Sequence, residues 1–283
     1  MSELIEPPPT AGRHADGNGA SREQAERLAA GHVGDHGHFP THFDEPSLDY
    51  SATTEITEET REELRAIAAR YPQARSALLP MLHLVQSVEG RVTPAGIEAC
   101  ATILDLSTAD VSGVATFYTM YKRRPVGQHH VGVCTTALCA ILGGDEVFTR
   151  LQDHLGIGND ETTEDGQVTL EHIECNAACD YAPVMMVNWE FFDNMTPESA
   201  CAVVDRLRAG EEVQATRGAR IGSWREAERV LAGFPDSKAD EGPTAGPASL
   251  LGLNIAHERG WSAPPAPIPD DEPDEEQQEA QDG

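Results

Sequence analysis

Apolar residues recur every three or four positions through residues 54–124, which is the spacing of helices with one buried face. Each helix is expected to begin at a capping residue or a proline. These starting positions are Thr57, Pro72, Thr93-Pro94 and Ser107. Pro80 lies inside the second helix and should bend it, and the fourth helix is expected to turn Phe117 and Tyr121 inward. Residues 54–124 are predicted to form a four-helix bundle.

From residue 125 to residue 210 the pattern changes to shorter segments of alternating apolar residues. Strands are predicted at residues 129–134, 168–173 and 183–187. Helices are predicted at Val147–Leu155 and after Thr196-Pro197, a second capping residue followed by proline. Strands and helices in this succession favour an α/β sandwich of thioredoxin-like type. The fold class is therefore α+β, a helical bundle followed by a small α/β domain.

The two flanks differ from this core in composition. Residues 1–53 hold too few apolar residues to build a core, so we expect disorder there. Residues 211–283 hold two apolar segments, Trp224–Phe234 and Leu250–Trp261, in an acidic background. Neither segment can bury itself alone, so both are expected to dock on a partner surface. Disorder of this extension is the alternative, and its acidic end is expected to be solvated.

The net charge of −28 argues against binding to nucleic acid or to an anionic membrane. Two helices joined by a short turn, at 93–104 and 107–121, could form a helix-turn-helix. DNA binding is nevertheless disfavoured, because residues 54–210 hold 23 acidic and 11 basic residues. Neither a signal peptide nor a run of about 18 apolar residues is present. We expect a cytoplasmic chain that does not insert into a membrane and whose partner is a protein.

Four cysteines form two close pairs in the pattern C-x4-C-x35-C-x3-C. They are Cys134, Cys139, Cys175 and Cys179. The cytosol keeps thiols reduced, which favours a metal site or redox chemistry over disulfides. Each pair follows a predicted strand, where side chains from separate segments can meet. The two other cysteines, Cys100 and Cys201, fall within predicted helices and are expected to be buried and structural.

Three kinds of site could use such a quartet. A dithiol redox site needs a C-x2-C pair, which neither close pair provides. A structural zinc site uses four thiolates, but usually in a small domain that needs the metal to fold. The wider loops here would let backbone N–H groups surround inorganic sulfides, which favours a [2Fe-2S] cluster. On spacing alone, zinc and unrelated buried thiols stay open.

At these residues the chain resembles the thioredoxin-like [2Fe-2S] protein of bacterial NADH-quinone oxidoreductase, its E subunit, which is the 24 kDa-type subunit of respiratory complex I. The resemblance extends over about residues 56–207. It is carried by LLPMLHLVQSVEGRVTP (78–94), VSGVATFYTMYKRRPVGQHHVGVC (111–134), IECNAACDYAPVMMVN (173–188) and FFDNMTPE (191–198). It implies that Cys134 and Cys139 ligate one iron and that Cys175 and Cys179 ligate the other. Ala177 stands where the family commonly has glycine, which puts the local backbone conformation in question.

The resemblance also implies a function, that of an electron-transfer subunit in a proton-translocating enzyme on the cytoplasmic face of the plasma membrane. The one cluster would exchange single electrons with the FMN of the F subunit, which also binds NADH and a [4Fe-4S] cluster, and the G subunit would be a further partner. The chain has no G-x-G-x-x-G after a strand and no phosphate-binding loop, so we expect no complete active site on it. Acidic Glu174 and Asp180 are expected to keep the cluster's potential low.

Two alternatives stay open at this point. The first is the equivalent diaphorase subunit of an NAD-linked hydrogenase or formate dehydrogenase. Such a subunit would carry the same cluster but belong to a different enzyme complex. The second is a structural zinc-binding module. Iron and zinc content of the purified chain would separate the second alternative from the others.

Overall fold

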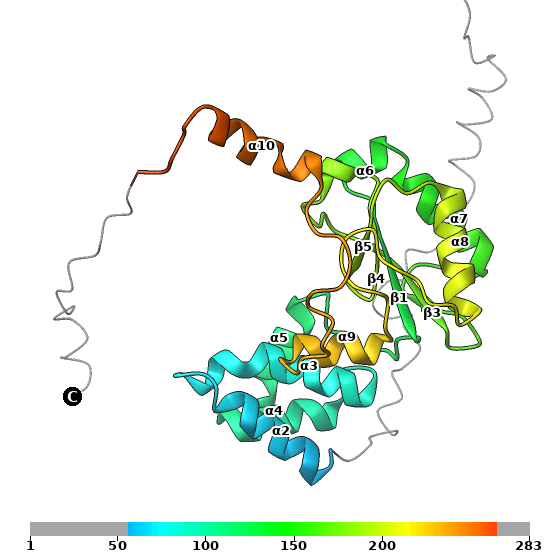
Figure 1. Ribbon diagram of the computed structural model, residues 1–283. Helices are drawn as coiled ribbons and strands as arrows, with labels where there is room; N and C mark the ends of the chain where they lie inside the picture. The colour runs from blue at the N-terminus through cyan, green and yellow to red at the C-terminus, as the bar shows by residue number, and fades with distance from the viewer. Residues whose placement is uncertain (1–55, 265–283) are drawn as a thin grey trace, which may run out of the picture. The chain divides into compact units, whose positions relative to one another are not determined.

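The computed structural model describes residues 56–264, and at their centre lies a five-stranded sheet (Figure 1). Its strands are β1 (His129–Cys134), β2 (Glu161–Thr162), β3 (Val168–Ile173), β4 (Met185–Val187) and β5 (Glu190–Phe192). The order across the sheet is β2-β3-β1-β4-β5. Strands β1 and β3 are parallel, and every other neighbouring pair is antiparallel. The chain therefore contains the predicted strands and two short ones that its apolar pattern does not announce.

Three helices accompany the sheet, namely α6 (Ala137–Ile141), α7 (Gly144–Leu155) and α8 (Pro197–Arg208). Helices α7 and α8 lie side by side on one face of the sheet (Figure 1). The core on this face consists of apolar side chains from both layers. They include Val131, Val133, Val147, Leu151, Leu170, Val204 and Leu207. Alternation along β1 thus turns its valines toward these helices and leaves its even-numbered residues for the other face.

A second core lies among the helices that precede the sheet. These are α2 (Glu58–Ala68), the 3₁₀ turn η1 (Ala74–Ala77), α3 (Leu78–Glu89), α4 (Pro94–Leu104) and α5 (Thr108–Phe117). The expected capping residues are confirmed at α2, α4 and α5, where the side chains of Thr57, Thr93 and Ser107 each accept a backbone N–H. Each cap satisfies a helix-end donor that would otherwise have no partner.

Two local predictions about these helices are wrong, namely the start of the second helix at Pro72 and the inward position of Phe117. Helix α3 begins at Leu78, so Pro80 occupies its first turn, where a missing N–H removes no intrahelical hydrogen bond. Helix α5 ends at Phe117, which is 79% exposed. Tyr121 follows the end of this helix and is buried in the helical core. Its hydroxyl donates to the Leu79 carbonyl oxygen over 2.9 Å.

The segment after α8 folds back onto the chain. Helix α9 (Trp224–Leu231) begins at a capping box on Ser223 and packs against α3 (Figure 1). Trp224 is only 1% exposed. The expectation that this apolar stripe needs a partner surface is therefore wrong for Trp224, which is buried within the same chain, whereas Val230 and Leu231 of the stripe are exposed. Helix α10 (Pro247–Glu258) differs, since it has no buried residue.

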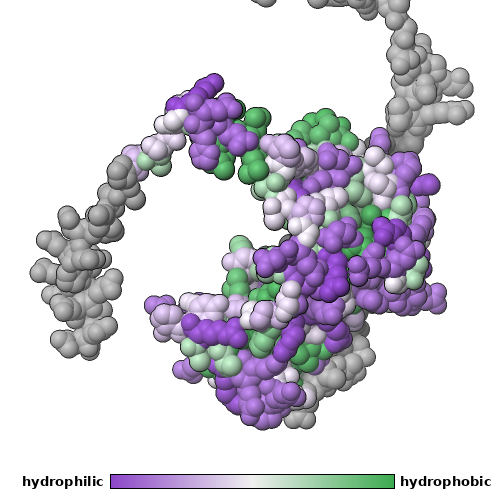
Figure 2. Space-filling model, in the orientation of Figure 1, coloured by the Kyte–Doolittle hydropathy of each residue, from purple (hydrophilic) through white to green (hydrophobic). Residues whose placement is uncertain are grey.

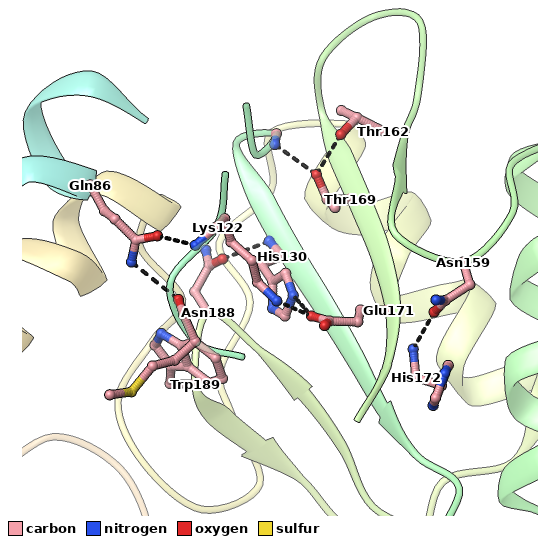
Figure 3. A network of polar contacts seen from close by, with 12 residues as sticks. Gln86, Lys122, His130, Asn159, Thr162, Thr169, Glu171, His172, Asn188 and Trp189 are labelled. Atoms are coloured by element: carbon pink, nitrogen blue, oxygen red, sulfur yellow. Dashed lines mark hydrogen bonds and ion pairs between the residues drawn. The ribbon is translucent and has the colours of Figure 1, made fainter. Parts of the chain in front are cut away.

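The sheet face opposite α7 and α8 carries a buried polar network. Lys122 and His130 converge on the carboxylate of Glu171, with 2.6 Å between His130 Nε2 and Glu171 Oε2 (Figure 3). The His130 ring lies against Trp189 and Trp224, with centroids 5.4 and 5.2 Å away. Burial alone would raise the pKa of Glu171, but the His130 hydrogen bond and the Lys122 charge more than offset it. The pKa of Glu171 lies below its ordinary value.

A second carboxylate, that of Glu228 on α9, is fully buried beside this network. It accepts hydrogen bonds from His83 Nδ1 over 2.6 Å, from Gln86 Nε2 over 2.7 Å and from Trp189 Nε1 over 3.0 Å. Gln86 in turn accepts from the Lys122 backbone N–H over 2.6 Å. One acidic side chain thus ties α9, α3 and the end of β4 together.

Two predictions fall on parts of the chain that lie outside the described residues, namely the disorder of residues 1–53 and the solvation of the acidic end. Over residues 56–264, no helix is long and apolar enough to cross a bilayer.

Candidate metal centre

The two cysteine pairs meet because β1 and β3 are parallel neighbours. Cys134 is the last residue of β1 and lies opposite Ile173, the last residue of β3. Parallel strands end at the same edge of a sheet, so the loops that follow them share one end of the domain. The first loop leads into α6 with Cys139, and the second carries Cys175 and Cys179.

The first pair is buried. Cys134 and Cys139 are 1% and 2% exposed and pack with Ala178 and Val184 in a small apolar cluster. Burial raises the pKa of the Cys139 thiol to about 11. A Cβ on Gly144 would lie 2.6 Å from the Cys134 carbonyl oxygen, so the start of α7 can approach this pair only as glycine.

The second pair is exposed, and its two sulfur atoms lie 3.6 Å apart. The Ala177 backbone N–H, which donates to Cys175, lowers the pKa of that thiol. The hydrogen bond between the two thiols, by contrast, raises the pKa of Cys179. Within this pair, Cys175 is therefore the thiol that ionises more readily.

The two thiol pairs lie next to each other at this edge of the sheet. The Thr136 hydroxyl lies 3.2 Å from Cys134 Sγ and also hydrogen-bonds Cys175. Cys179 interacts electrostatically with both Cys134 and Cys139. Among residues 56–264 no three His, Cys, Asp or Glu side chains converge as a single metal ion requires. The structure thus brings together all four predicted residues, as two pairs.

The loop between Cys175 and Cys179 has two unusual features. Ala177 has a φ of +54°, the left-handed conformation that glycine adopts without strain. This is the position where the resemblance raised a question about the backbone. Asn176 Nδ2 is buried and has no hydrogen-bond partner within the described part of the chain.

These features fit a [2Fe-2S] cluster. Four thiols in two pairs match the two ligands that each iron requires. A buried amide donor without a partner suits an inorganic sulfide or thiolate, which accept hydrogen bonds. Such a centre can accept and release one electron at a time. The remaining cysteines are buried as expected, and burial raises the pKa of Cys100 to about 12.

Sequence reasoning missed the apolar surface beside the thiols. On α6 and the residue after it, Leu138, Ile141 and Leu142 are 43%, 80% and 53% exposed. Helix α10 adds exposed leucines, and Figure 2 shows apolar residues gathered over α6 and α10. The start of α10 contacts the second cysteine loop, since the Ala248 N–H donates to the Tyr181 hydroxyl over 3.1 Å. The signal in the sequence was the group of apolar residues on both sides of Cys139.

Known proteins of similar sequence include [2Fe-2S] proteins with this fold. The model of the thioredoxin-like [2Fe-2S] ferredoxin family matches residues 64–208. The E subunit of NADH-quinone oxidoreductase from Mycobacterium bovis is 57% identical over 208 residues, which are 73% of this chain and 82% of that relative. The E 2 subunit of the same enzyme from Rhizobium meliloti is 39% identical over 153 residues, which cover 54% of this chain and 91% of that relative.

Among solved structures, a thioredoxin-like [2Fe-2S] ferredoxin from Aquifex aeolicus is 23% identical, with a TM-score of 0.26. The match covers 31% of this chain and 87% of that structure.

Proposed function

The chain belongs to the thioredoxin-like [2Fe-2S] ferredoxin family, among the E subunits of NADH-quinone oxidoreductases, and we propose that it is the electron-transfer subunit of such an oxidoreductase. The observation that carries this proposal is the meeting of two thiol pairs at the shared end of β1 and β3. Its cluster would accept and release single electrons.

We assign one iron to each pair, with Cys134 and Cys139 on one side and Cys175 and Cys179 on the other. The protein's own residues then have distinct tasks. The buried first pair excludes water from one half of the site, while the exposed second pair leaves the other half open to a partner. Thr136 and Asn176 supply donors that stabilise negative charge on sulfur.

We propose that the catalytic chemistry with NADH takes place on a partner, the F subunit, which holds FMN, and that the G subunit completes the assembly. This chain would then contribute no complete active site. Helices α2 to α5, as a helical bundle, would provide the docking surface. The complex would lie on the cytoplasmic face of the membrane. Exposed Leu138, Ile141 and Leu142 beside the thiols support a protein partner at this end of the domain.

The test is to purify the full chain and measure iron, zinc, visible absorption and low-temperature EPR before and after dithionite. We expect about two irons per chain and a rhombic signal on reduction. Cys139→Ser and Cys175→Ser should each lose this signal. Cys201→Ser, a buried cysteine on α8, is the matched control and should keep it. One zinc and no iron in the unaltered chain would instead support a structural zinc site.

A further inference from the structure

Arg217 lies nine residues beyond the part of the chain that matches the family model, yet it reaches the cysteine loop. The segment that carries it pairs with the edge of the sheet at β5. The Thr216 N–H donates to the Phe191 carbonyl oxygen over 2.9 Å, and Arg217 forms an antiparallel bridge with Phe191. This pairing fixes where the Arg217 side chain enters the domain.

The Arg217 guanidinium is held on four sides. It lies over the Tyr181 ring at 5.2 Å and over the Phe191 ring at 4.9 Å from the centroids. Nη2 donates to Asp193 Oδ1 over 2.7 Å, and Nη1 lies 3.9 Å from Asp180 Oδ2. The side chain is 19% exposed. A planar cation suits this place, because it can stack on two rings while it pairs with carboxylates.

These partners belong to the two sides of the metal centre. Asp180 and Tyr181 directly follow Cys179 in the 3₁₀ turn η2 (Cys179–Tyr181). Phe191 packs against the apolar cluster that contains the first cysteine pair. Arg217 is therefore in contact with a residue beside each pair of thiols.

On the basis of the proposed function, we propose that Arg217 is a positioning residue that holds the Cys179 loop and makes the cluster easier to reduce. Reduction adds one negative charge to a centre that four thiolates already make negative. Asp180 and Asp193 oppose that added charge, and Arg217 offsets them. The sequence alone suggested that Asp180 lowers the potential, whereas the structure places a compensating cation beside it.

Removal of the cation has two expected consequences. Two carboxylates would remain beside the cysteine loop without their shared cation. The Asp193 side chain is only 9% exposed, so its charge is poorly screened by water. The loop would also lose the stacking on Tyr181, since an uncharged side chain makes no cation–π contact.

The experiment is an EPR-monitored redox titration of the full chain carrying its cluster, in which Arg217→Gln is compared with the unaltered protein. We expect the equilibrium constant for reduction to fall about tenfold, which moves a one-electron midpoint by about 59 mV to more negative values. Arg217→Lys keeps the charge and should shift the midpoint less. An unchanged midpoint in Arg217→Gln, or an equal shift in both variants, would overturn the proposal.

Arg220→Gln is the matched control, because it removes the same charge three residues along the same segment. Arg220 is 47% exposed and pairs with Glu212 and Glu241, neither of which Arg217 contacts. The midpoint of the cluster in Arg220→Gln should equal that in the unaltered chain. If Arg220→Gln shifts the midpoint as much as Arg217→Gln does, the shift arises from net charge alone. The proposed positioning role of Arg217 would then be wrong.

A second measurement does not depend on a bound cluster. The Tyr181 N–H donates to the Ala178 carbonyl oxygen over 3.1 Å within the loop that Arg217 contacts. In the cluster-free chain, hydrogen exchange at this amide should accelerate about tenfold in Arg217→Gln and stay unchanged in Arg220→Gln. Equal exchange in both would overturn the positioning role. Absence of iron from the unaltered chain would instead overturn the proposed function alone.

Discussion

The two ends of one face of β1 have opposite character. At the start of the strand, His130 joins a network in which Glu171 and Glu228 find their hydrogen-bond partners inside the chain. At its end, Cys134 joins a group of thiols, of which the second pair is open to solvent. Only about 13 Å of extended strand separates the two ends. The end at His130 therefore stabilises the fold, and the end at Cys134 presents thiols that can bind a metal centre.

Stability and chemistry depend on different residues in this molecule. The carboxylates of Glu171 and Glu228 link segments that are far apart in sequence, and removal of one partner would leave charges without compensation. The thiols need no such internal partners, since a metal centre would supply them. The two regions should therefore respond separately to substitution.

The largest expected effect is that of Glu228→Ala, which leaves three donors from His83, Gln86 and Trp189 without an acceptor. We expect the free energy of unfolding to fall by about 3 kcal/mol or more, as for other broken buried charge networks. Urea unfolding measures the loss. The visible spectrum of the folded protein should stay unchanged, because Glu228 contacts none of the cysteines.

Glu211→Ala is the control for this substitution. Glu211 pairs with Arg206 at the surface, where its side chain is 56% exposed, so the change should stay within about 0.5 kcal/mol. If Glu228→Ala bleached the cluster spectrum while the protein stayed folded, the separation of the two regions would be wrong.

The next effect concerns pH and Glu171, whose pKa lies below the ordinary value of 4.5. A carboxyl with a lowered pKa in the folded state contributes stability that is complete above the unfolded pKa and is lost as the pH falls through the folded one. Near pH 7, the free energy of unfolding of the unaltered chain should exceed that of Glu171→Gln by about 2 kcal/mol. The difference should shrink below pH 4.5.

Urea unfolding of both proteins at a series of pH values measures this difference. The comparison at each pH cancels the acid lability of a bound cluster, since both proteins keep the four cysteines. A difference that grew as the pH fell would mean that Glu171 is protonated in the folded protein, contrary to its contacts with Lys122 and His130.

The smallest effect is expected in the cysteine loop, from Ala177→Gly. Ala177 has a φ of +54°, where a Cβ costs about 1 kcal/mol. Glycine removes this strain but adds freedom to the unfolded chain, so we expect a net gain of about 0.5 kcal/mol in urea unfolding. Ala178→Gly is the control. Its φ is −104° and its side chain is buried, so glycine there should destabilise the protein.

Local signals in the sequence predicted most of the elements. Capping residues, prolines and apolar spacing place α2, α4, α5, α7 and α8, and alternation places β1 and β3. Strands β2 and β5 hold two and three residues, too few for a pattern. The position of α9 could not be predicted either, because its partner α3 is more than a hundred residues away in sequence.

The four cysteines of the candidate site could be picked out from the sequence, but the residues around them could not. The spacing of four cysteines singles them out, and parallel pairing of β1 with β3 explains why they meet. The role of Arg217 has no local signal, since the residue reaches Tyr181 and Asp180 only through pairing at the edge of the sheet.

The pairing of the C-terminal segment with β5 also bears on the biosynthesis of the protein. A ribosome makes the chain from its N-terminus, so all four cysteines are translated before Arg217 and Trp224. A nascent chain that ends at α8 holds all four cysteines but neither the bridge to Phe191 nor Trp224, which lies buried against His130 and Trp189. Any metal bound at that stage would meet a domain whose β5 edge is not yet paired with the segment around Arg217.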